Sequence, residues 1–119
     1  NKVAFNQNDY AAYVLSKKAF AEFTRMAAVE FAPSIRVNGV APGIVLPAES
    51  RSRNYIDWRI QAGVPLQRQG TLEELAQAVS FFESTEFVTG HVLAVDGGES
   101  VNLTGLNATD WQEEGPTKS

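Results

Sequence analysis

Two short segments rich in β-branched and apolar residues, each followed by a glycine-containing turn, most constrain the fold of this chain. The first covers residues 35–41 before a Pro-Gly pair, and the second covers residues 91–95 before Asp-Gly-Gly. Helical patterns lie between them, and strands separated by helices pair in parallel through crossover connections. A parallel sheet needs cover on both faces and more than two strands. The sequence therefore predicts an α/β fold in which this chain forms part of a parallel sheet.

Three segments have the character of helices. Residues 10–32 contain neither proline nor glycine, and a short helix is expected near 53–62 inside the irregular stretch 44–68. A helix as apolar as the first needs cover on more than one side, from a sheet and from a partner subunit. We expect its packing face to consist of residues at helical spacing, namely Phe20, Phe23, Ala27 and Phe31, widened by Leu15, Ala19 and Met26.

The third helix is expected to begin at a capping box. The Thr71 hydroxyl can accept from the Glu74 N–H, while the Glu74 carboxylate can accept from the Thr71 N–H. An apolar face then follows at helical spacing, made of Leu72, Leu75, Ala76, Val79 and Phe82.

Composition limits the classes of function. The 119 residues, 44% of them hydrophobic, suffice for one domain with a core, and the net charge of -4 argues against nucleic acids and anionic membranes. The absence of cysteine excludes disulfides and a cysteine nucleophile. No apolar run approaches the roughly 20 residues that cross a bilayer, and the first residues do not form a targeting signal. We expect a cytoplasmic protein with no nucleic-acid or membrane partner.

Tyr13 and Lys17 are the first candidates for chemistry. Residues four apart share one face of a helix. An ammonium near a phenol favours the phenolate, and a phenol tuned in this way can exchange a proton with a substrate oxygen. Neither Tyr10 nor Tyr55 has a lysine four residues later. Taken alone, the pair also fits a surface tyrosine over a solvated lysine.

The surroundings of this pair decide between the two interpretations. Tyr13-Val14-Leu15-Ser16-Lys17 is followed in order by three further blocks, at residues 35–43, 71–76 and 88–98. This series resembles the C-terminal half of the short-chain dehydrogenase/reductase family over residues 9–101. The resemblance implies the C-terminal half of a doubly wound, Rossmann-type domain. We assign residues 1–101 to that half, with its catalytic helix, substrate loop and last two strands, and 102–119 to a C-terminal tail.

The resemblance also implies roles for individual residues. Tyr13 would be the catalytic acid or base, and Lys17 would hold the ribose hydroxyls of a nicotinamide cofactor. The loop from 45 to 69 would close over a small-molecule substrate, and the helices that carry Tyr13 and Glu73 would build the interfaces of a homotetramer. The residues implied in cofactor binding are Tyr13, Lys17, Pro42, Gly43, Ile44 and Val45, and those implied in the substrate loop are Leu46, Pro47, Tyr55 and Trp58.

Within the family, the run from Pro42 to Pro47 lacks a threonine and is followed by Val-Pro-Leu-Gln-Arg at 64–68. In this respect the chain is similar to pteridine reductases, which reduce pterins and folates with NADPH, so NADP is favoured over NAD. Tyr55 and Trp58 could offer flat surfaces to such a substrate, or could anchor the loop to the body. Reductases of 3-oxoacyl, sugar or alcohol-type substrates remain alternatives. His91 is the only histidine, and we expect no metal site.

Two parts of the family pattern are missing from these residues. There is no glycine-rich turn of the kind that holds a cofactor pyrophosphate. The family also implies a serine or aspartate as partner of the tyrosine, at a spacing that falls at or just before Asn1, and no such residue is found there. We therefore expect activity only together with an N-terminal cofactor-binding half, present as a separate segment or chain. The alternatives are a genuinely split enzyme and a non-catalytic structural subunit that retains part of the fold.

Overall fold

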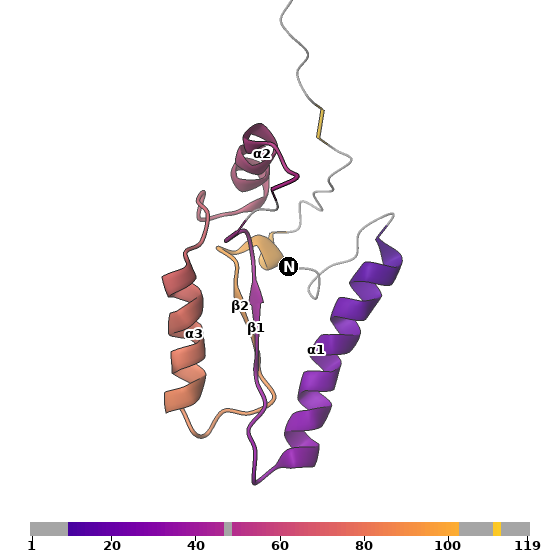
Figure 1. Cartoon of the computed structure of the whole chain (residues 1–119), viewed down its shortest axis with the longest axis vertical. Helices are drawn as coiled ribbons and strands as arrows, with labels where there is room; N and C mark the ends of the chain where they lie inside the picture. The colour runs from indigo at the N-terminus through magenta and orange to yellow at the C-terminus, as the bar shows by residue number, and fades with distance from the viewer. Residues whose placement is uncertain (1–9, 47–48, 103–110, 113–119) are drawn as a thin grey trace, which may run out of the picture.

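A computed structural model of the chain describes residues 10–46, 49–102 and 111–112. Two strands, β1 (Gly39–Pro42) and β2 (Val92–Val95), pair in parallel with Gly39 opposite Val92 and Pro42 opposite Val95. The predicted α/β fold with a parallel sheet is confirmed. The helices are α1 (Ala11–Phe31), α2 (Arg53–Gly63) and α3 (Leu72–Ser84), with a 3₁₀ turn, η1 (Glu99–Val101), after β2 (Figure 1).

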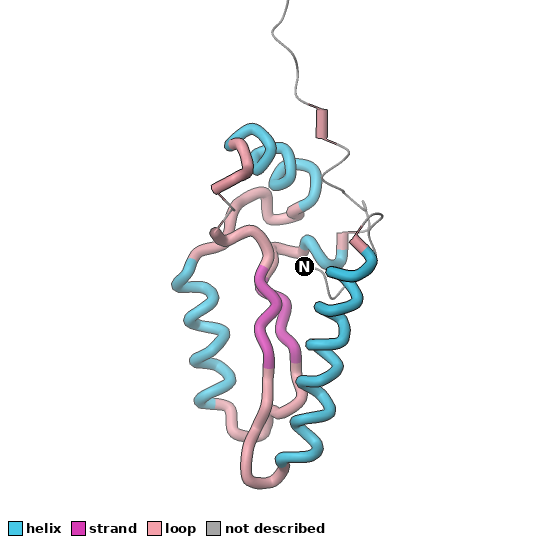
Figure 2. The backbone as a smooth tube through the Cα atoms, turned by 45° about the vertical axis from the view of Figure 1, so that its right-hand side comes forward, coloured by secondary structure: helices cyan, strands magenta, loops and turns pink. Residues whose placement is uncertain are grey.

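The elements form layers around the two strands. In both views α1 and α3 lie on either side of β1 and β2, while α2 lies beyond the carboxyl ends of the strands (Figures 1 and 2). That edge is where open α/β sheets bind their ligands. A hydrophobic cluster of Tyr55, Ile56 and Ile60 forms on α2, with Ile44, Trp58 and Trp111 packed against it.

The predicted packing face of α1 is confirmed at Ala27 and is wrong at its large residues. Phe20 and Phe23 are 69% and 60% exposed, and the buried residues of α1 are smaller: Val14, Ala21, Thr24, Ala27 and Ala28. The reason is the close approach of the helix to the strands. A Cβ on Gly39 would lie 3.8 Å from the Thr24 methyl group, so little room remains for a large side chain.

The third helix begins as predicted but packs differently. The Glu74 N–H donates to Thr71 Oγ1 at 3.1 Å and the Thr71 N–H donates to Glu74 Oε2 at 2.9 Å, which confirms the capping box. Of the predicted apolar face, Phe82 is buried, whereas Leu72 and Val79 are more than half exposed. Ala78, outside that face, is the other buried residue of α3.

The first strand starts four residues later than predicted. Before Gly39, two side chains bind the last turn of α3 and the loop after it: Arg36 Nη1 donates to Phe82 O at 2.7 Å, and Asn38 Nδ2 donates to Val88 O at 3.0 Å. The Gly39 N–H then donates to His91 O at 2.8 Å. Side-chain bonds of this kind replace backbone pairing, which periodicity alone does not reveal.

Candidate active site

Tyr13 and Lys17 lie on one face of the first two turns of α1. The Lys17 Nζ atom is 5.5 Å from the centroid of the Tyr13 ring, within the range of a cation–π contact. The Tyr13 side chain is 49% exposed, so its hydroxyl is accessible to a ligand. Together with Pro42 and other residues of α1, β1 and β2, the pair lines a cavity of about 360 Å³.

The cofactor-binding residues predicted after Pro42 lie elsewhere. Gly43 donates its N–H to Val95 O at 3.0 Å and closes the pairing of the strands. Ile44 packs against the cluster on α2, and Val45 is buried with its carbonyl accepting from Gln69 Nε2. The structure thus brings Tyr13, Lys17 and Pro42 around one cavity, whereas none of the other three lines it. Their role in cofactor binding stays a prediction.

The residues predicted for the substrate loop are also spread out. Leu46 is 74% exposed, and Pro47 lies outside the described residues. Tyr55 and Trp58 lie on α2 with ring centroids 5.8 Å apart, and Tyr55 is only 6% exposed. Burial of Tyr55 favours the interpretation in which this ring anchors the loop.

Sequence reasoning missed Trp111. The residue belongs to the segment interpreted as a tail, yet its ring centroid is 5.5 Å from that of Trp58 and 6.1 Å from that of Tyr55. The available signal was a tryptophan, one of two in the chain, within an otherwise polar stretch. Large aromatic rings of this kind are usually packed against other apolar groups.

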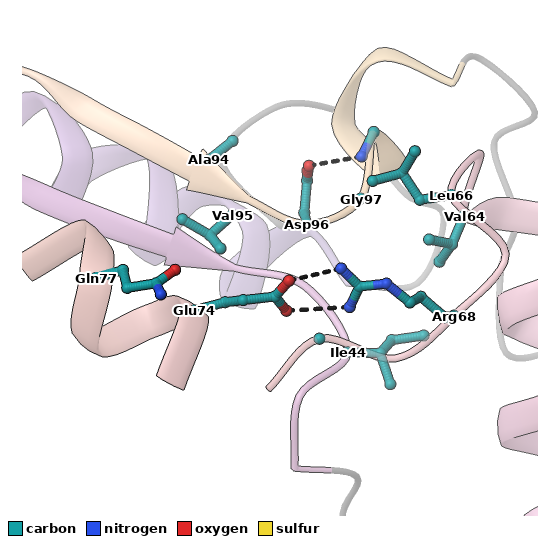
Figure 3. Close-up of a pocket in the computed structure, with 12 residues that line it drawn as sticks. Ile44, Val64, Leu66, Arg68, Glu74, Gln77, Ala94, Val95, Asp96 and Gly97 are labelled. Atoms are coloured by element: carbon teal, nitrogen blue, oxygen red, sulfur yellow. Dashed lines mark hydrogen bonds and ion pairs between the residues drawn. The ribbon is translucent and has the colours of Figure 1, made fainter. Parts of the chain in front are cut away.

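A second cavity, of about 400 Å³, lies between α3, the loop after α2 and the end of β2 (Figure 3). Neither Tyr13 nor Lys17 lines it. Three charged side chains line it, and two of them pair with each other, with Arg68 Nη1 3.0 Å from Glu74 Oε2. The third, Asp96, accepts from the Gly98 and Ser100 N–H groups. Because these carboxylates are engaged in the turn and the ion pair, whereas Tyr13 is half exposed with Lys17 beside it, we place the candidate active site at Tyr13.

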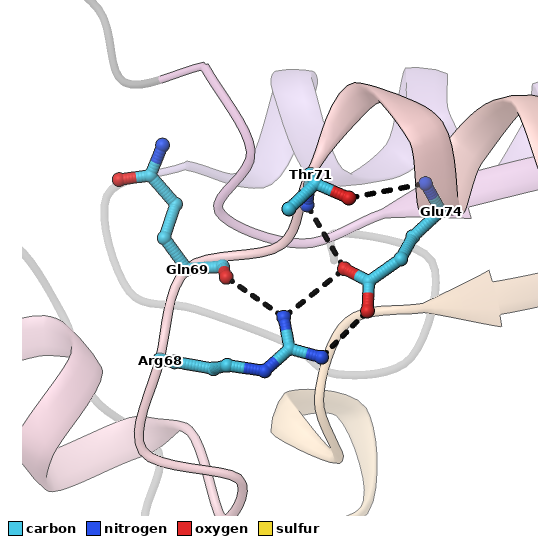
Figure 4. Close-up of polar contacts among 4 residues, drawn as sticks. All are labelled: Arg68, Gln69, Thr71 and Glu74. Atoms are coloured by element: carbon cyan, nitrogen blue, oxygen red, sulfur yellow. Dashed lines mark hydrogen bonds and ion pairs between the residues drawn. The ribbon is translucent and has the colours of Figure 1, made fainter.

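The pairing of Arg68 and Glu74 carries a prediction about pH (Figure 4). Hydrogen bonds from the Arg68 side chain and then from the Thr71 backbone lower the pKa of Glu74 to about 2. The unfolded-state pKa is about 4.3, so ionised Glu74 adds stability above that value and loses it as the pH falls towards 2. We expect Glu74→Gln to lower the melting temperature near neutral pH, by an amount that shrinks as the pH approaches 2.

Thermal unfolding followed by circular dichroism over a pH series measures this effect. Glu73→Gln is the matched control, because it removes a carboxylate from the same helical turn and leaves the pair of Arg68 and Glu74 intact. A difference between wild type and Glu74→Gln that stays constant from neutral to acid pH would contradict the assignment.

Two further observations concern the described residues alone. Across residues 10–46, 49–102 and 111–112, no three histidine, aspartate or glutamate side chains gather in a way that could hold a metal ion. The same part of the chain contains no helix that is long and apolar enough to cross a membrane.

Comparison with known proteins decides the family. A family model described as enoyl-(acyl carrier protein) reductase matches residues 2–100. The chain belongs to the short-chain dehydrogenase/reductase family. The resemblance carried by the four sequence blocks is thereby confirmed.

Two curated members of the family are close in sequence. Pteridine reductase 1 of Leishmania tarentolae is 41% identical over 97 residues, which cover 77% of this chain and 33% of that protein. The 3-oxoacyl-[acyl-carrier-protein] reductase of Homo sapiens is 40% identical over 87 residues, which cover 72% of this chain and 36% of that protein. The chain therefore spans about a third of the length of these two relatives.

Two solved structures share the fold. FolM alternative dihydrofolate reductase 1 from Brucella suis, in complex with NADP, superimposes with a TM-score of 0.70 at 38% identity and covers 75% of this chain and 36% of that one. A 4-hydroxyisoleucine dehydrogenase complexed with NADH gives a TM-score of 0.75 at 28% identity, covering 84% of this chain and 44% of that one.

Proposed function

We propose that this chain carries the proton-transfer site of an NAD(P)H-dependent reductase, with Tyr13 as the proton donor. The observation that carries the proposal is the placement of Tyr13 and Lys17 on one helical face, beside one cavity that runs along β1 to its last residue, Pro42. Membership of the family supports the same chemistry. A scaffold protein would have no use for a half-exposed tyrosine next to an ammonium in that position.

The residues of the cavity have the chemistry that a nicotinamide ribose requires. The Tyr13 hydroxyl and the Lys17 ammonium offer hydrogen bonds to ribose hydroxyls, while Pro42 and Val40 give the opposite wall an apolar character. The residues present therefore fit the sugar and ring of such a cofactor. No glycine-rich turn for the pyrophosphate occurs in the 119 residues, so we propose that an N-terminal half supplies it from a preceding segment or a separate chain.

We propose separate roles for the cofactor, Tyr13 and Lys17. When bound, the nicotinamide supplies a hydride to the carbon of a C=O or C=N group. Tyr13 donates its phenolic proton to the oxygen or nitrogen that gains negative charge in that step. Lys17 lies close enough to stabilise the resulting phenolate and to hold the ribose.

For the substrate we propose a pterin or folate, with NADPH as the reductant. The similarity to a pteridine reductase and to a dihydrofolate reductase structure that contains NADP supports this choice. A 3-oxoacyl substrate is the second candidate, because the human 3-oxoacyl reductase is nearly as similar in sequence. A non-catalytic structural subunit is the third candidate, and it is disfavoured by the geometry of Tyr13 and Lys17.

We further propose that the complete enzyme is a homotetramer. Large apolar residues of α1 that do not line the cavity are exposed in this chain, as a subunit interface requires: Leu15, Phe23, Met26 and Val29.

A substrate panel tests the proposed function. The complete enzyme would be incubated with NADPH and, in turn, an oxidised pterin, dihydrofolate and a 3-oxoacyl thioester, with NADPH oxidation followed by absorbance. We expect turnover of the pterin and dihydrofolate, with kcat/KM at least about tenfold above that for the thioester. Preference for the thioester would replace the proposed substrate by the second candidate. Failure to oxidise NADPH with any carbonyl or imine substrate would reject the reductase itself.

A further inference from the structure

The chain that follows β2 returns to α2 and contacts it at three points. The Arg59 guanidinium of α2 forms an ion pair with Glu99 of η1. The Asn102 Nδ2 atom donates to Gly63 O at 3.2 Å, at the last residue of α2. Trp111 packs against Tyr55 and the neighbouring ring on α2. These contacts bring the last described residues of the chain onto the helix of the predicted substrate loop.

Burial and a hydrogen-bonded turn hold Glu99 in its position beside Arg59. Glu99 is 6% exposed, although it carries a carboxylate, so it depends on its partners for compensation. The Asp96 carboxylate stabilises the turn that contains Glu99. Its Oδ2 atom accepts from the Ser100 N–H at 2.9 Å, and its Oδ1 atom accepts from the Gly98 N–H at 3.1 Å. The end of β2 is thereby connected through a short, hydrogen-bonded turn to Arg59.

The contact at Trp111 completes an aromatic cluster. Its ring meets Tyr55 nearly edge-on, at an interplanar angle of 83°, and lies tilted at 50° against Trp58. Tyr55 is buried within this cluster, and Ile44 packs against the same cluster. Ile44 follows Pro42 by two residues, so the cluster is joined by a short run of backbone to the cavity that Tyr13 lines.

The position of α2 depends on these contacts more than on the sheet. α2 lies beyond the carboxyl ends of the strands, whereas α1 and α3 lie alongside them (Figure 1). A helix of 11 residues without a broad packing surface on the sheet keeps its place through the side chains that reach it from elsewhere.

We propose that Trp111 and Glu99 are positioning residues, which hold α2 in place beyond the carboxyl ends of the strands and thereby set how tightly substrate is bound. The proposal rests on the proposed function, because it takes α2 to be part of the substrate loop. It assigns a role to the segment after β2 that the interpretation of residues 102–119 as a tail did not include.

The experiment uses the complete enzyme with Trp111→Ala, the conservative variant Trp111→Phe and the matched control Gln112→Ala, which alters an exposed neighbouring residue. Amide hydrogen exchange would be measured by mass spectrometry over α2 and α3. In Trp111→Ala we expect exchange in α2 to accelerate at least about tenfold while that in α3 stays unchanged. Trp111→Phe is expected to restore most of the protection, and Gln112→Ala to match wild type.

Kinetics provide the second measurement. We expect Trp111→Ala to raise KM for the substrate severalfold while kcat stays within about twofold, since Tyr13 and Lys17 are untouched. Unchanged exchange in α2, or equal acceleration in α2 and α3, would overturn the positioning role. Faster exchange in α2 with unchanged KM would overturn the link to substrate. Hydrogen exchange can be measured without turnover. An enzyme that is inactive on the whole substrate panel would therefore reject the proposed function, while the exchange data would still test whether Trp111 holds α2.

Discussion

Replacing Tyr13 with phenylalanine is expected to lower kcat of the complete enzyme by about 10²- to 10⁴-fold, the usual contribution of a general acid or base. The substitution removes one hydroxyl and keeps the aromatic ring beside Lys17. Since Tyr13 is half exposed and lines a cavity, the packing of α1 should not change. The measurement is steady-state turnover together with thermal unfolding, and the melting temperature is expected to match wild type.

Tyr10→Phe provides the control for this experiment. It removes a hydroxyl from a tyrosine one turn earlier, at the N-cap of α1. Tyr10 is not among the residues that line the cavity. Its turnover is expected to stay close to that of wild type. Near-normal activity in Tyr13→Phe would remove Tyr13 from the mechanism, because no transition-state proton transfer could then depend on its hydroxyl.

Local patterns in the sequence were sufficient to predict the three helices and a parallel sheet, although β1 starts four residues later than predicted. Proline, glycine and the capping box lie at the ends of the helices, and α1 and α2 begin and end within a residue of the predicted bounds. The alternation of strands and helices predicted the parallel pairing of β1 with β2. Tyr13 and Lys17 could be selected because spacing along a helix fixes which side chains share a face.

Packing could not be predicted from the same patterns. The first helix is apolar on several sides, and only the distance between backbones decides which side meets the strands. Beside Gly39 that distance leaves 3.8 Å between an added Cβ and the Thr24 methyl group, so Thr24 is buried there while Phe20 stays exposed. Trp111 was missed for a related reason, since its contacts with α2 join residues more than 50 positions apart and leave no periodic signal.

Replacing Gly43 with alanine is expected to cost about 1–3 kcal/mol of unfolding free energy, the range typical of overpacking. A Cβ at this position would lie 2.7 Å from the Cα and 2.8 Å from the Cβ of Asp96. These atoms belong to or adjoin the backbone, so β1 and the turn after β2 would have to move apart. Chemical denaturation of the wild-type and variant complete enzyme measures the loss.

Gly39→Ala, at the first residue of the strand that Gly43 follows, is the matched control, because its new Cβ would meet Val92 Cγ2 at 3.6 Å, an ordinary contact distance. We expect that variant to be neutral or slightly more stable, as glycine costs more chain entropy on folding.

The consequences of Gly43→Ala should extend to α2, since Asp96 stabilises the turn that contains Glu99, the partner of Arg59. A shift of Asp96 would therefore loosen α2 as well, and hydrogen exchange in α2 should rise in Gly43→Ala but not in Gly39→Ala. Equal stability of the two variants would show that the ends of the strands can separate without cost, contrary to the close approach at Gly43.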